Sequence, residues 1–253
     1  MRNRRNTART VRTNIMERID DLERENLRII QNPDKFCFGI DAVLLTGFAK
    51  LKPGETMVDI GTGNGVIPIL MTSKGEGIMH YGLEIQEDMA EMANRSVELN
   101  HLGDKVRIIC CDVNKSSEVI ANSSMDVVTC NPPYMNDEHG LKNDNRSLAI
   151  ARHEITMTLD DAIREGCRML RSGGRYYMVH RPHRLMDVIT TMRKYRLEPK
   201  RMRMVHPFED KEANMVLIEA AKDGKPFLKV ERPLIVYRTQ GEYTEEVKKL
   251  YYE

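Results

Sequence analysis

The sequence predicts an α/β fold built on a mostly parallel sheet that ends in an antiparallel pair of strands. From residue 56 onward, short β-prone apolar runs alternate with longer amphipathic segments, a pattern typical of βαβ units. The last two runs, 199–206 and 213–221, are joined by a short polar link. That link is too short for a helical crossover, so we expect these two strands to be antiparallel.

Seven strands and the helices between them can be assigned in chain order. We expect strands at 56–60, 79–84, 105–111, 125–130, 174–180, 199–206 and 213–221. Helices are expected between them, including 86–99 and 158–170, the second ended by Ser172-Gly173-Gly174. Before the first strand, segments 27–31 and 35–38 flank Asn32-Pro33-Asp34, which predicts a hairpin turn. Asp41 can cap a helix that continues to Lys50.

Length and composition fit one globular domain with small additions. The chain has 253 residues, of which 41% are hydrophobic and 30% charged, as in ordinary globular proteins. No apolar run approaches the length of a membrane span, and no signal peptide is visible at the start. The five cysteines lack Cys-x-x-Cys spacing, which argues against a disulfide framework or a zinc site. We therefore expect a cytoplasmic protein with no metal.

A glycine-rich loop follows the first strand. The run Asp59-Ile60-Gly61-Thr62-Gly63-Asn64-Gly65 leads into an apolar helical stretch, and its glycines let a ligand lie against bare backbone. The Gly-x-Gly-x-Gly pattern differs from the Gly-x-Gly-x-x-Gly fingerprint of dinucleotide sites. An aspartate here repels a pyrophosphate but can accept hydrogen bonds from an ammonium group, which S-adenosylmethionine carries. The loop alone leaves a nicotinamide site as an alternative.

Two further acids follow the next two strands. Glu84 closes the second strand, where a carboxylate can accept both hydroxyls of a ribose. Asp112 follows the third strand and can bind the amino group of an adenine. Either acid alone is typical of a solvated strand end or a helix cap. In series with Asp59, the two acids indicate a site for a methyl donor.

The tetrapeptide Asn131-Pro132-Pro133-Tyr134 ends the fourth strand. Its prolines forbid further ladder hydrogen bonds, so the run 125–130 stops there. A rigid turn at this end of a strand presents an amide, a carbonyl and an aromatic face at the edge where open α/β sheets bind ligands. These groups suit a flat, amino-bearing substrate such as adenine. The alternative is an ordinary Asn-Pro turn with a buried tyrosine.

With these motifs, the chain resembles the class I methyltransferases, and more closely the bacterial tRNA(Val) adenine-N6 methyltransferases that modify the base beside the anticodon. The resemblance runs from about Glu17 to Gly224. Besides the glycine loop and the asparagine turn, it is carried by the segments 17–22, 30–32, 36–45 and 151–154, the last reading Ala-Arg-His-Glu. Only the amino-terminal segments and Arg152-His153-Glu154 point to the closer subfamily.

The resemblance implies a Rossmann-like, seven-stranded sheet and transfer of a methyl group from S-adenosyl-L-methionine to N6 of an adenine in tRNA. At the reacting amine it implies Asn131, Pro132 and Tyr134. Around the cofactor it implies Gly39, Asp41, Asp59, Gly61, Gly63, Gly65, Glu84, Ile85, Asp112, Val113 and Asn131. Against the tRNA we expect Pro133, Tyr134, Arg152, His153, Arg181, Arg201 and Arg203. His153 remains open between a catalytic and a structural role.

Four regions are expected along the chain. Residues 1–14 form a disordered basic arm, and 15–50 form a hairpin and a helix that cap the cofactor site. Residues 51–223 form the methyltransferase domain, and 224–253 a C-terminal extension. Within the domain, the polar stretch 135–156 is expected as a mobile loop over the acceptor site or as a surface insertion.

Charge is unevenly distributed although the net charge is only +1. Segment 171–206 holds ten lysines or arginines and two acids, and residues 1–14 hold five arginines and no acid. Such segments attract phosphate backbones, although a solvated helix face has the same composition. We therefore expect tRNA as the partner, with no membrane and no obligate protein partner.

Four alternative functions remain open from the sequence. The nearest is a protein-glutamine N5-methyltransferase, whose acceptor is also a planar amide, followed by a guanine-N2 rRNA methyltransferase. A non-catalytic RNA-binding module and a nicotinamide-dependent dehydrogenase are weaker candidates, since the acids and the asparagine turn are all present.

Overall fold

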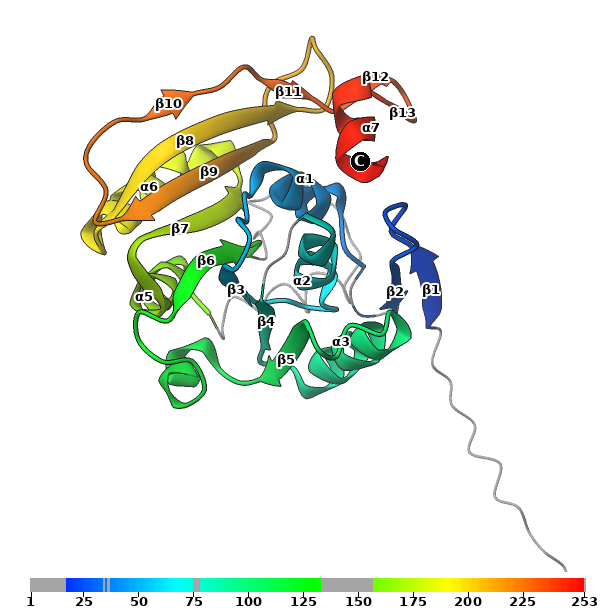
Figure 1. Ribbon diagram of the computed structural model, residues 1–253. Coiled ribbons are helices and arrows are strands. Elements are labelled where there is room, and N and C mark those ends of the chain that lie inside the picture. The colour runs from blue at the N-terminus through cyan, green and yellow to red at the C-terminus, as the bar shows by residue number, and fades with distance from the viewer. Residues whose placement is uncertain (1–16, 34, 36, 75–77, 133–156, 253) are drawn as a thin grey trace, which may run out of the picture.

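The computed structural model describes residues 17–33, 35, 37–74, 78–132 and 157–252, and a nine-stranded sheet runs through these residues. The strand order is β10-β8-β9-β7-β6-β3-β4-β5, and β11 also pairs with β8 (Figure 1). The strands are β3 (Thr56–Ile60), β4 (Met79–Glu84), β5 (Val106–Cys110), β6 (Met125–Cys130), β7 (Leu170–His180), β8 (Leu197–His206), β9 (Met215–Lys222), β10 (Lys229–Val230) and β11 (Leu234–Ile235).

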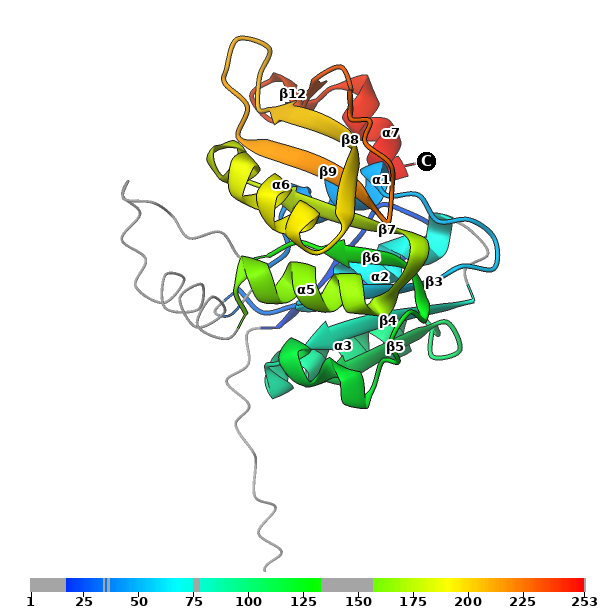
Figure 2. The ribbon, with the colours of Figure 1, turned by 90° about the vertical axis from the view of Figure 1, so that its left-hand side faces the viewer.

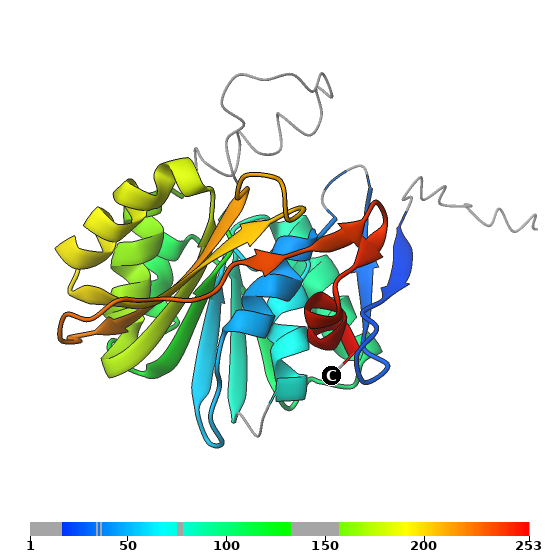
Figure 3. The ribbon, with the colours of Figure 1, turned by 90° about the horizontal axis from the view of Figure 1, so that it is seen from above.

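Helices cover both faces of the sheet, and each face has its own apolar core (Figure 3). One face carries α1 (Ile40–Phe48), α2 (Val66–Met71) and α3 (Glu87–Leu99), and the other carries η2 (Val113–Glu118), α5 (Leu159–Met169) and α6 (Leu185–Lys194). Because side chains alternate along a strand, Met57 packs into the first core and the adjacent Val58 into the second. Figure 2 shows α5 and α6 side by side on their face of the sheet. The fold is therefore a three-layer α/β/α sandwich.

The predicted α/β class and the mixed sheet are confirmed. Strands β3 to β7 are mutually parallel where they pair, and β9 runs antiparallel to both β7 and β8. The predicted order of strands and helices from residue 56 to residue 221 is reproduced, and β10 and β11 then add to the edge at β8. None of the helices among the described residues is long and apolar enough to cross a membrane.

The predicted bounds of α5 hold to within one residue, but the predicted role of Ser172-Gly173-Gly174 in ending the helix is wrong. The helix begins with a capping box between Thr158 and Asp161 but ends at Met169, and β7 begins at the next residue. Ser172-Gly173-Gly174 therefore lies inside the strand, where the register with β6 shifts between Leu170 and Arg175. Gly173 has a φ of +78°, a conformation that side chains disfavour, so the glycines form an irregularity in the strand.

The predicted amino-terminal hairpin is also displaced. Strand β1 (Arg18–Asp21) pairs with β2 (Arg28–Gln31), so the turn spans 22–27 and not 32–34. Three residues of the turn, Glu23, Glu25 and Asn26, have positive φ, which sequence patterns seldom reveal for a glutamate. Asp41 is not the helix cap, because Gly39 occupies the N-cap position of α1 and makes no side-chain cap.

Residues after Gly224 extend the sheet and then return to α1. Beyond β10 and β11, a hairpin of β12 (Tyr237–Thr239) and β13 (Glu242–Tyr243) leads into α7 (Glu245–Tyr252), which packs against α1 (Figure 1). Tyr243 stacks between Tyr237 and Tyr251, with 5.2 Å between ring centroids on each side. All three rings belong to the tail. Tyr237 also contacts Phe208 of the domain, with 5.6 Å between ring centroids, and this contact helps to attach the tail.

The packing of α5 on the sheet gives a testable prediction. A Cβ at Gly166 would overlap the ring of Tyr176 and approach Val128 to 3.2 Å. We expect Gly166→Ala to lower the free energy of unfolding by about 1–3 kcal/mol despite the better helix propensity of alanine. Urea unfolding measures the change, with Gly103→Ala as control because no atom lies within 4 Å of its Cβ position. Equal midpoints for the two variants would contradict the packing.

Candidate functional site

The register of four parallel strands brings the predicted site residues to one edge of the sheet. Ile60 at the end of β3 pairs with Cys130 at the end of β6 and with Leu83 of β4. Glu84 in turn pairs with Cys110 at the end of β5. The chain therefore leaves the sheet at neighbouring points before Asn131, Gly61, Ile85 and Cys111, along the carboxyl edge where α/β sheets bind ligands.

The glycine loop lies across the end of β4. Its three glycines all have positive φ, at +69°, +58° and +84° for Gly61, Gly63 and Gly65. The N–H of Thr62 donates to the carbonyl of Leu83 at 2.9 Å, and that of Gly63 donates to Glu84 Oε2 at 2.9 Å. The buried Glu84 carboxylate also accepts from the N–H of Gln86 at 3.0 Å. Glu84 is therefore held rigidly beside the loop.

Asp59 is fully buried beneath this loop. Its Oδ1 accepts a hydrogen bond of 2.7 Å from the hydroxyl of Thr129, which lies two residues before Asn131. Burial raises the pKa of Asp59 to about 7, although hydrogen bonding opposes the shift. Asp59 thus joins the glycine loop on β3 to the asparagine turn that follows β6.

Several buried polar atoms around the loop have no hydrogen-bond partner among the residues that the structure describes. They are Asp59 Oδ2, Thr62 Oγ1 and both polar side-chain atoms of Asn64. Buried polar groups in native proteins are normally paired, so this group of donors and acceptors fits a polar ligand with amino and carboxyl groups. The residues present are therefore compatible with S-adenosylmethionine.

A pocket lies beside the loop and combines predicted and unpredicted residues. It is lined by Gly61, Leu83, Glu84, Ile85, Cys111, Val113 and Met157. Leu83, Cys111 and Met157 were not predicted. The first two directly precede the predicted acids Glu84 and Asp112, so their place at the strand ends was a usable signal, whereas Met157 follows a long polar stretch and offered none.

The other predicted cofactor residues lie at helix starts. Asp112 is half-buried and caps η2, its Oδ1 accepting from the N–H of Asn114 at 2.9 Å. Gly39 and Asp41 lie at the start of α1, which packs against α2. The Asp41 carboxylate accepts from the N–H of the next residue, Ala42, at 3.0 Å.

Two residues of the predicted acceptor turn are described by the structure. Asn131 is half-buried and Pro132 is buried, directly after the last residue of β6. The predicted residues Pro133, Tyr134, Arg152 and His153 lie outside the described residues. Asn131 and Pro132 therefore carry the structural argument for the acceptor site.

The basic segment 171–206 has internal partners for its charge. Eight of its ten cations form ion pairs: Arg171 with Asp126, Arg175 with Glu55, Arg184 with Asp187, Arg193 with Glu198, Lys194 with Asp160, Arg196 with Asp223, Arg201 with Glu219, and Arg203 with Glu246. Lys200 and Arg181 donate to the carbonyls of Lys225 and Asn214. Six of these ion pairs join the segment to acids elsewhere in the fold.

Among the predicted tRNA contacts, Arg201 and Arg203 make hydrogen bonds within the protein. Arg201 also donates to the carbonyl of Phe48 at 2.6 Å, and its guanidinium lies 3.9 Å from the centre of the Phe48 ring. Arg203 donates to the carbonyl of Arg232 at 2.9 Å. Arg181 differs, because it directly follows β7 at the same edge of the sheet as Asn131.

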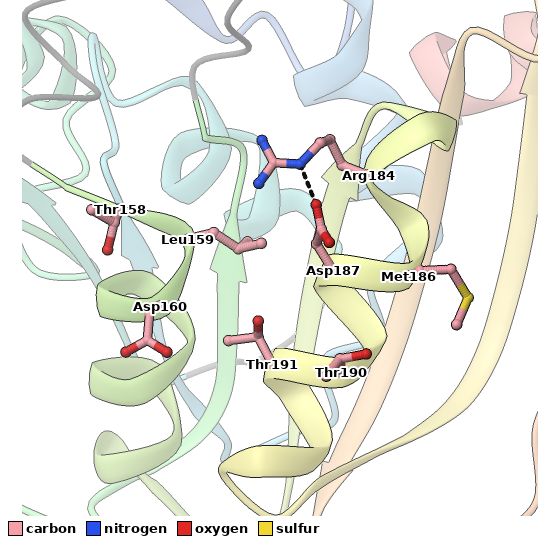
Figure 4. Close-up of a pocket in the computed structure, with 8 residues that line it drawn as sticks. All are labelled: Thr158, Leu159, Asp160, Arg184, Met186, Asp187, Thr190 and Thr191. Atoms are coloured by element: carbon pink, nitrogen blue, oxygen red, sulfur yellow. Dashed lines mark hydrogen bonds and ion pairs between the residues drawn. The ribbon is translucent and has the colours of Figure 1, made fainter.

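A groove opens between the starts of α5 and α6 (Figure 4). Its lining comprises Thr158, Leu159, Asp160, Arg184, Met186, Asp187, Thr190 and Thr191. Arg184 and Asp187 form an ion pair of 2.6 Å within it. None of the lining residues was predicted as a site residue, and acids and bases occur together, so the groove shows no preference for one sign of charge.

Comparison with known proteins gives the family and similar sequences. Residues 51–227 match the family model described as a methyltransferase domain. The chain is 29% identical over 223 residues to a tRNA1(Val) (adenine(37)-N6)-methyltransferase of Porphyromonas gingivalis, covering 84% of this chain and 86% of that protein. It is 26% identical over 220 residues to the protein of the same name from Parabacteroides distasonis, covering 84% and 90%.

Solved structures share the fold. A predicted O-methyltransferase from Agrobacterium tumefaciens matches with a TM-score of 0.68 and 22% identity, covering 83% of this chain and 94% of that one. A geranyl diphosphate methyltransferase in complex with SAM matches with a TM-score of 0.53 and 18% identity, covering 72% and 84%. With the family model matching more than half of its length, this chain belongs to the methyltransferase domain family and is an enzyme that uses S-adenosylmethionine as its cofactor.

Proposed function

We propose that the protein methylates the exocyclic N6 of an adenine in tRNA, at the base beside the anticodon of a valine tRNA. One observation carries the proposal. The asparagine turn follows β6 and the glycine loop follows β3, and these two strands are neighbours in the sheet. An acceptor held at Asn131 would therefore lie next to a donor held at Gly61. The names of the similar proteins support adenine N6 as the acceptor atom.

The described residues of the turn can bind an amino group. The Asn131 side-chain oxygen and the Pro132 carbonyl are acceptors on consecutive residues, and each would accept one N6 hydrogen. Accepting both hydrogens draws the nitrogen toward tetrahedral geometry, so its lone pair becomes available for bond formation. S-adenosylmethionine supplies a methyl group on a positive sulfonium, so the protein needs only to orient the amine and exclude water.

The proposed cofactor contacts follow the order of the strands. Glu84 keeps acceptor capacity on both carboxylate oxygens beyond its two backbone hydrogen bonds and would bind ribose hydroxyls. Asp112, at the end of β5, would accept from the adenine amino group. The unpaired Asp59 Oδ2 would accept from an ammonium group, while Thr129 holds the other oxygen of the same carboxylate.

The alternatives make different products. A protein-glutamine N5-methyltransferase would modify a protein, and a guanine-N2 enzyme would make N2-methylguanosine. The sequence favoured RNA partly because segment 171–206 is basic. The ion pairs that this segment forms within the protein remove that argument. The support for tRNA thus comes from the named relatives and the five arginines of residues 1–14, which lie outside the described residues.

The direct test is transfer of a tritiated methyl group from S-adenosylmethionine to total tRNA from cells that lack the modification. Nucleoside analysis should then show N6-methyladenosine, recovered in valine tRNA. Label in N2-methylguanosine, or in a release-factor protein offered in parallel, would replace the proposal with the corresponding alternative.

Replacing Asn131 should separate catalysis from binding. Asn131→Ala removes one of two acceptors for the amine, and we expect kcat to fall by about 10²–10³, by analogy with the loss of one oriented hydrogen bond at other reacting centres. Binding of S-adenosylmethionine, measured by calorimetry, should change far less. Asn122→Ala is the control, because that side chain only accepts from Arg168 on the surface. Unchanged methylation by Asn131→Ala would exclude the proposed mechanism.

Asp59 should make stability depend on pH in a defined direction. Its pKa is about 7 in the folded protein and about 4 in the unfolded chain, so its favourable contribution is fully present below pH 4 and is lost as pH rises through 7. Without cofactor, the wild type should lose on the order of 4 kcal/mol relative to Asp59→Asn across this range. Urea unfolding of both proteins at each pH measures the difference, because all other titrating groups are shared. A difference that does not vary with pH would show that folding does not raise the pKa of Asp59.

A further inference from the structure

A buried arginine lies in the turn between β1 and β2, outside the site described above. Arg24 is only 7% exposed, and its Nε and Nη1 atoms are buried with no hydrogen-bond partner in the described part of the chain. The one acid that favours its charge electrostatically is the neighbouring Glu25, an exposed residue. Burying a guanidinium without an anion costs folding free energy, because a charge in a protein interior is stabilised only by charged or hydrogen-bonding partners.

A second cation lies close to Arg24. Lys74 ends η1 (Thr72–Lys74), which continues from α2. The residue is half-buried and forms no ion pair with a described acid. Burial lowers its pKa to about 8, and the nearby positive charges of Arg24 and Arg201 contribute. Two cations from distant parts of the sequence therefore interact electrostatically, and neither forms an ion pair with an acid among the described residues.

Arg201 shows what a compensated cation in the same region looks like. It pairs with Glu219 at 2.8 Å and with Glu231 at 3.4 Å, and it donates to the carbonyl of Phe48. Each of its three nitrogens has a partner, whereas Nε and Nη1 of Arg24 have none among the described residues. Arg24 and Lys74 therefore differ from Arg201 in forming no ion pair with an acid among the described residues.

The two cations lie away from the methyl-transfer site. Helix α2 begins after the glycine loop at the carboxyl edge of the sheet and runs back toward the start of β4. Lys74 therefore lies at the opposite, amino edge. The turn of the β1–β2 hairpin lies on the same side of the sheet as α1 and α2 (Figure 3).

We propose that Arg24 and Lys74 form a binding site for a phosphate group. An oxyanion would accept from the unpaired Nε and Nη1 donors of Arg24 and would neutralise the adjacent ammonium of Lys74. Such charge-assisted hydrogen bonds are stronger in a partly buried site than at the surface. Free phosphate-bearing metabolites and the RNA backbone both supply this group.

The test measures stabilisation of the full-length protein by inorganic phosphate. Thermal unfolding in phosphate is compared with unfolding in chloride at equal ionic strength and pH 7, and the wild type should show a saturable rise in Tm of several degrees. Arg24→Met should lose this rise while remaining at least as stable as the wild type in chloride, because it removes an unpaired buried charge. Lys74→Met should also weaken the response, and Arg107→Met, at an exposed arginine of β5, should retain it.

The source of the phosphate group is resolved by a second measurement on the same proteins. If RNA supplies it, Arg24→Met should weaken tRNA binding several-fold and phosphate should compete with tRNA for the wild type. If a small molecule supplies it, tRNA binding is unchanged while the loss of phosphate stabilisation persists. A wild type that phosphate stabilises no more than chloride, or an Arg24→Met protein that responds as the wild type does, would overturn the site.

Discussion

The function of this molecule depends on the register of its parallel strands. Hydrogen bonding fixes Ile60 opposite both Cys130 and Leu83, so three chain segments leave the sheet within adjacent strand spacings of about 5 Å. A shift of one residue in any of these strands would turn its side chains to the opposite face. It would remove the buried Asp59 carboxylate from the Thr129 hydroxyl that binds it. The donor loop and the acceptor turn are thus positioned by the same backbone hydrogen bonds that hold the sheet.

The sequence predicted the residues at the strand ends because their neighbours along the chain reveal where strands stop. Gly61 and Asn131 each follow an apolar run, and Glu84 closes one. Glu84 and Asn131 carry distinctive side chains, and Gly61 carries none. The amino-terminal hairpin was misplaced for the opposite reason. Asn-Pro-Asp is a strong local turn signal, whereas the observed turn contains glutamates with positive φ, held by tertiary packing of Leu22 and Leu27 into the core.

Charge partners could not be read from the sequence, because they lie far apart along the chain. The basic segment 171–206 looked like a polyanion-binding surface, yet Arg175 pairs with Glu55 across 120 residues. The two carboxylates of the Arg201 network come from β9 and from the extension after Gly224. A composition window counts only the charges inside it. Whether a cation is available to a ligand depends on what the fold brings beside it, and that is a property of topology.

Unpaired buried polar atoms are informative because the fold also decides which groups lie beside them. Among the described residues they concentrate in two places, around Asp59 and Asn64 beneath the glycine loop and at Arg24 in the hairpin turn. Folding leaves such groups without water, and a chain that retains them loses stability unless something else satisfies them. At the loop, family membership identifies a cofactor rich in polar groups. At Arg24 the partner has to be an acceptor, since a guanidinium has only donors, and the second positive charge of Lys74 favours an acceptor that is negatively charged.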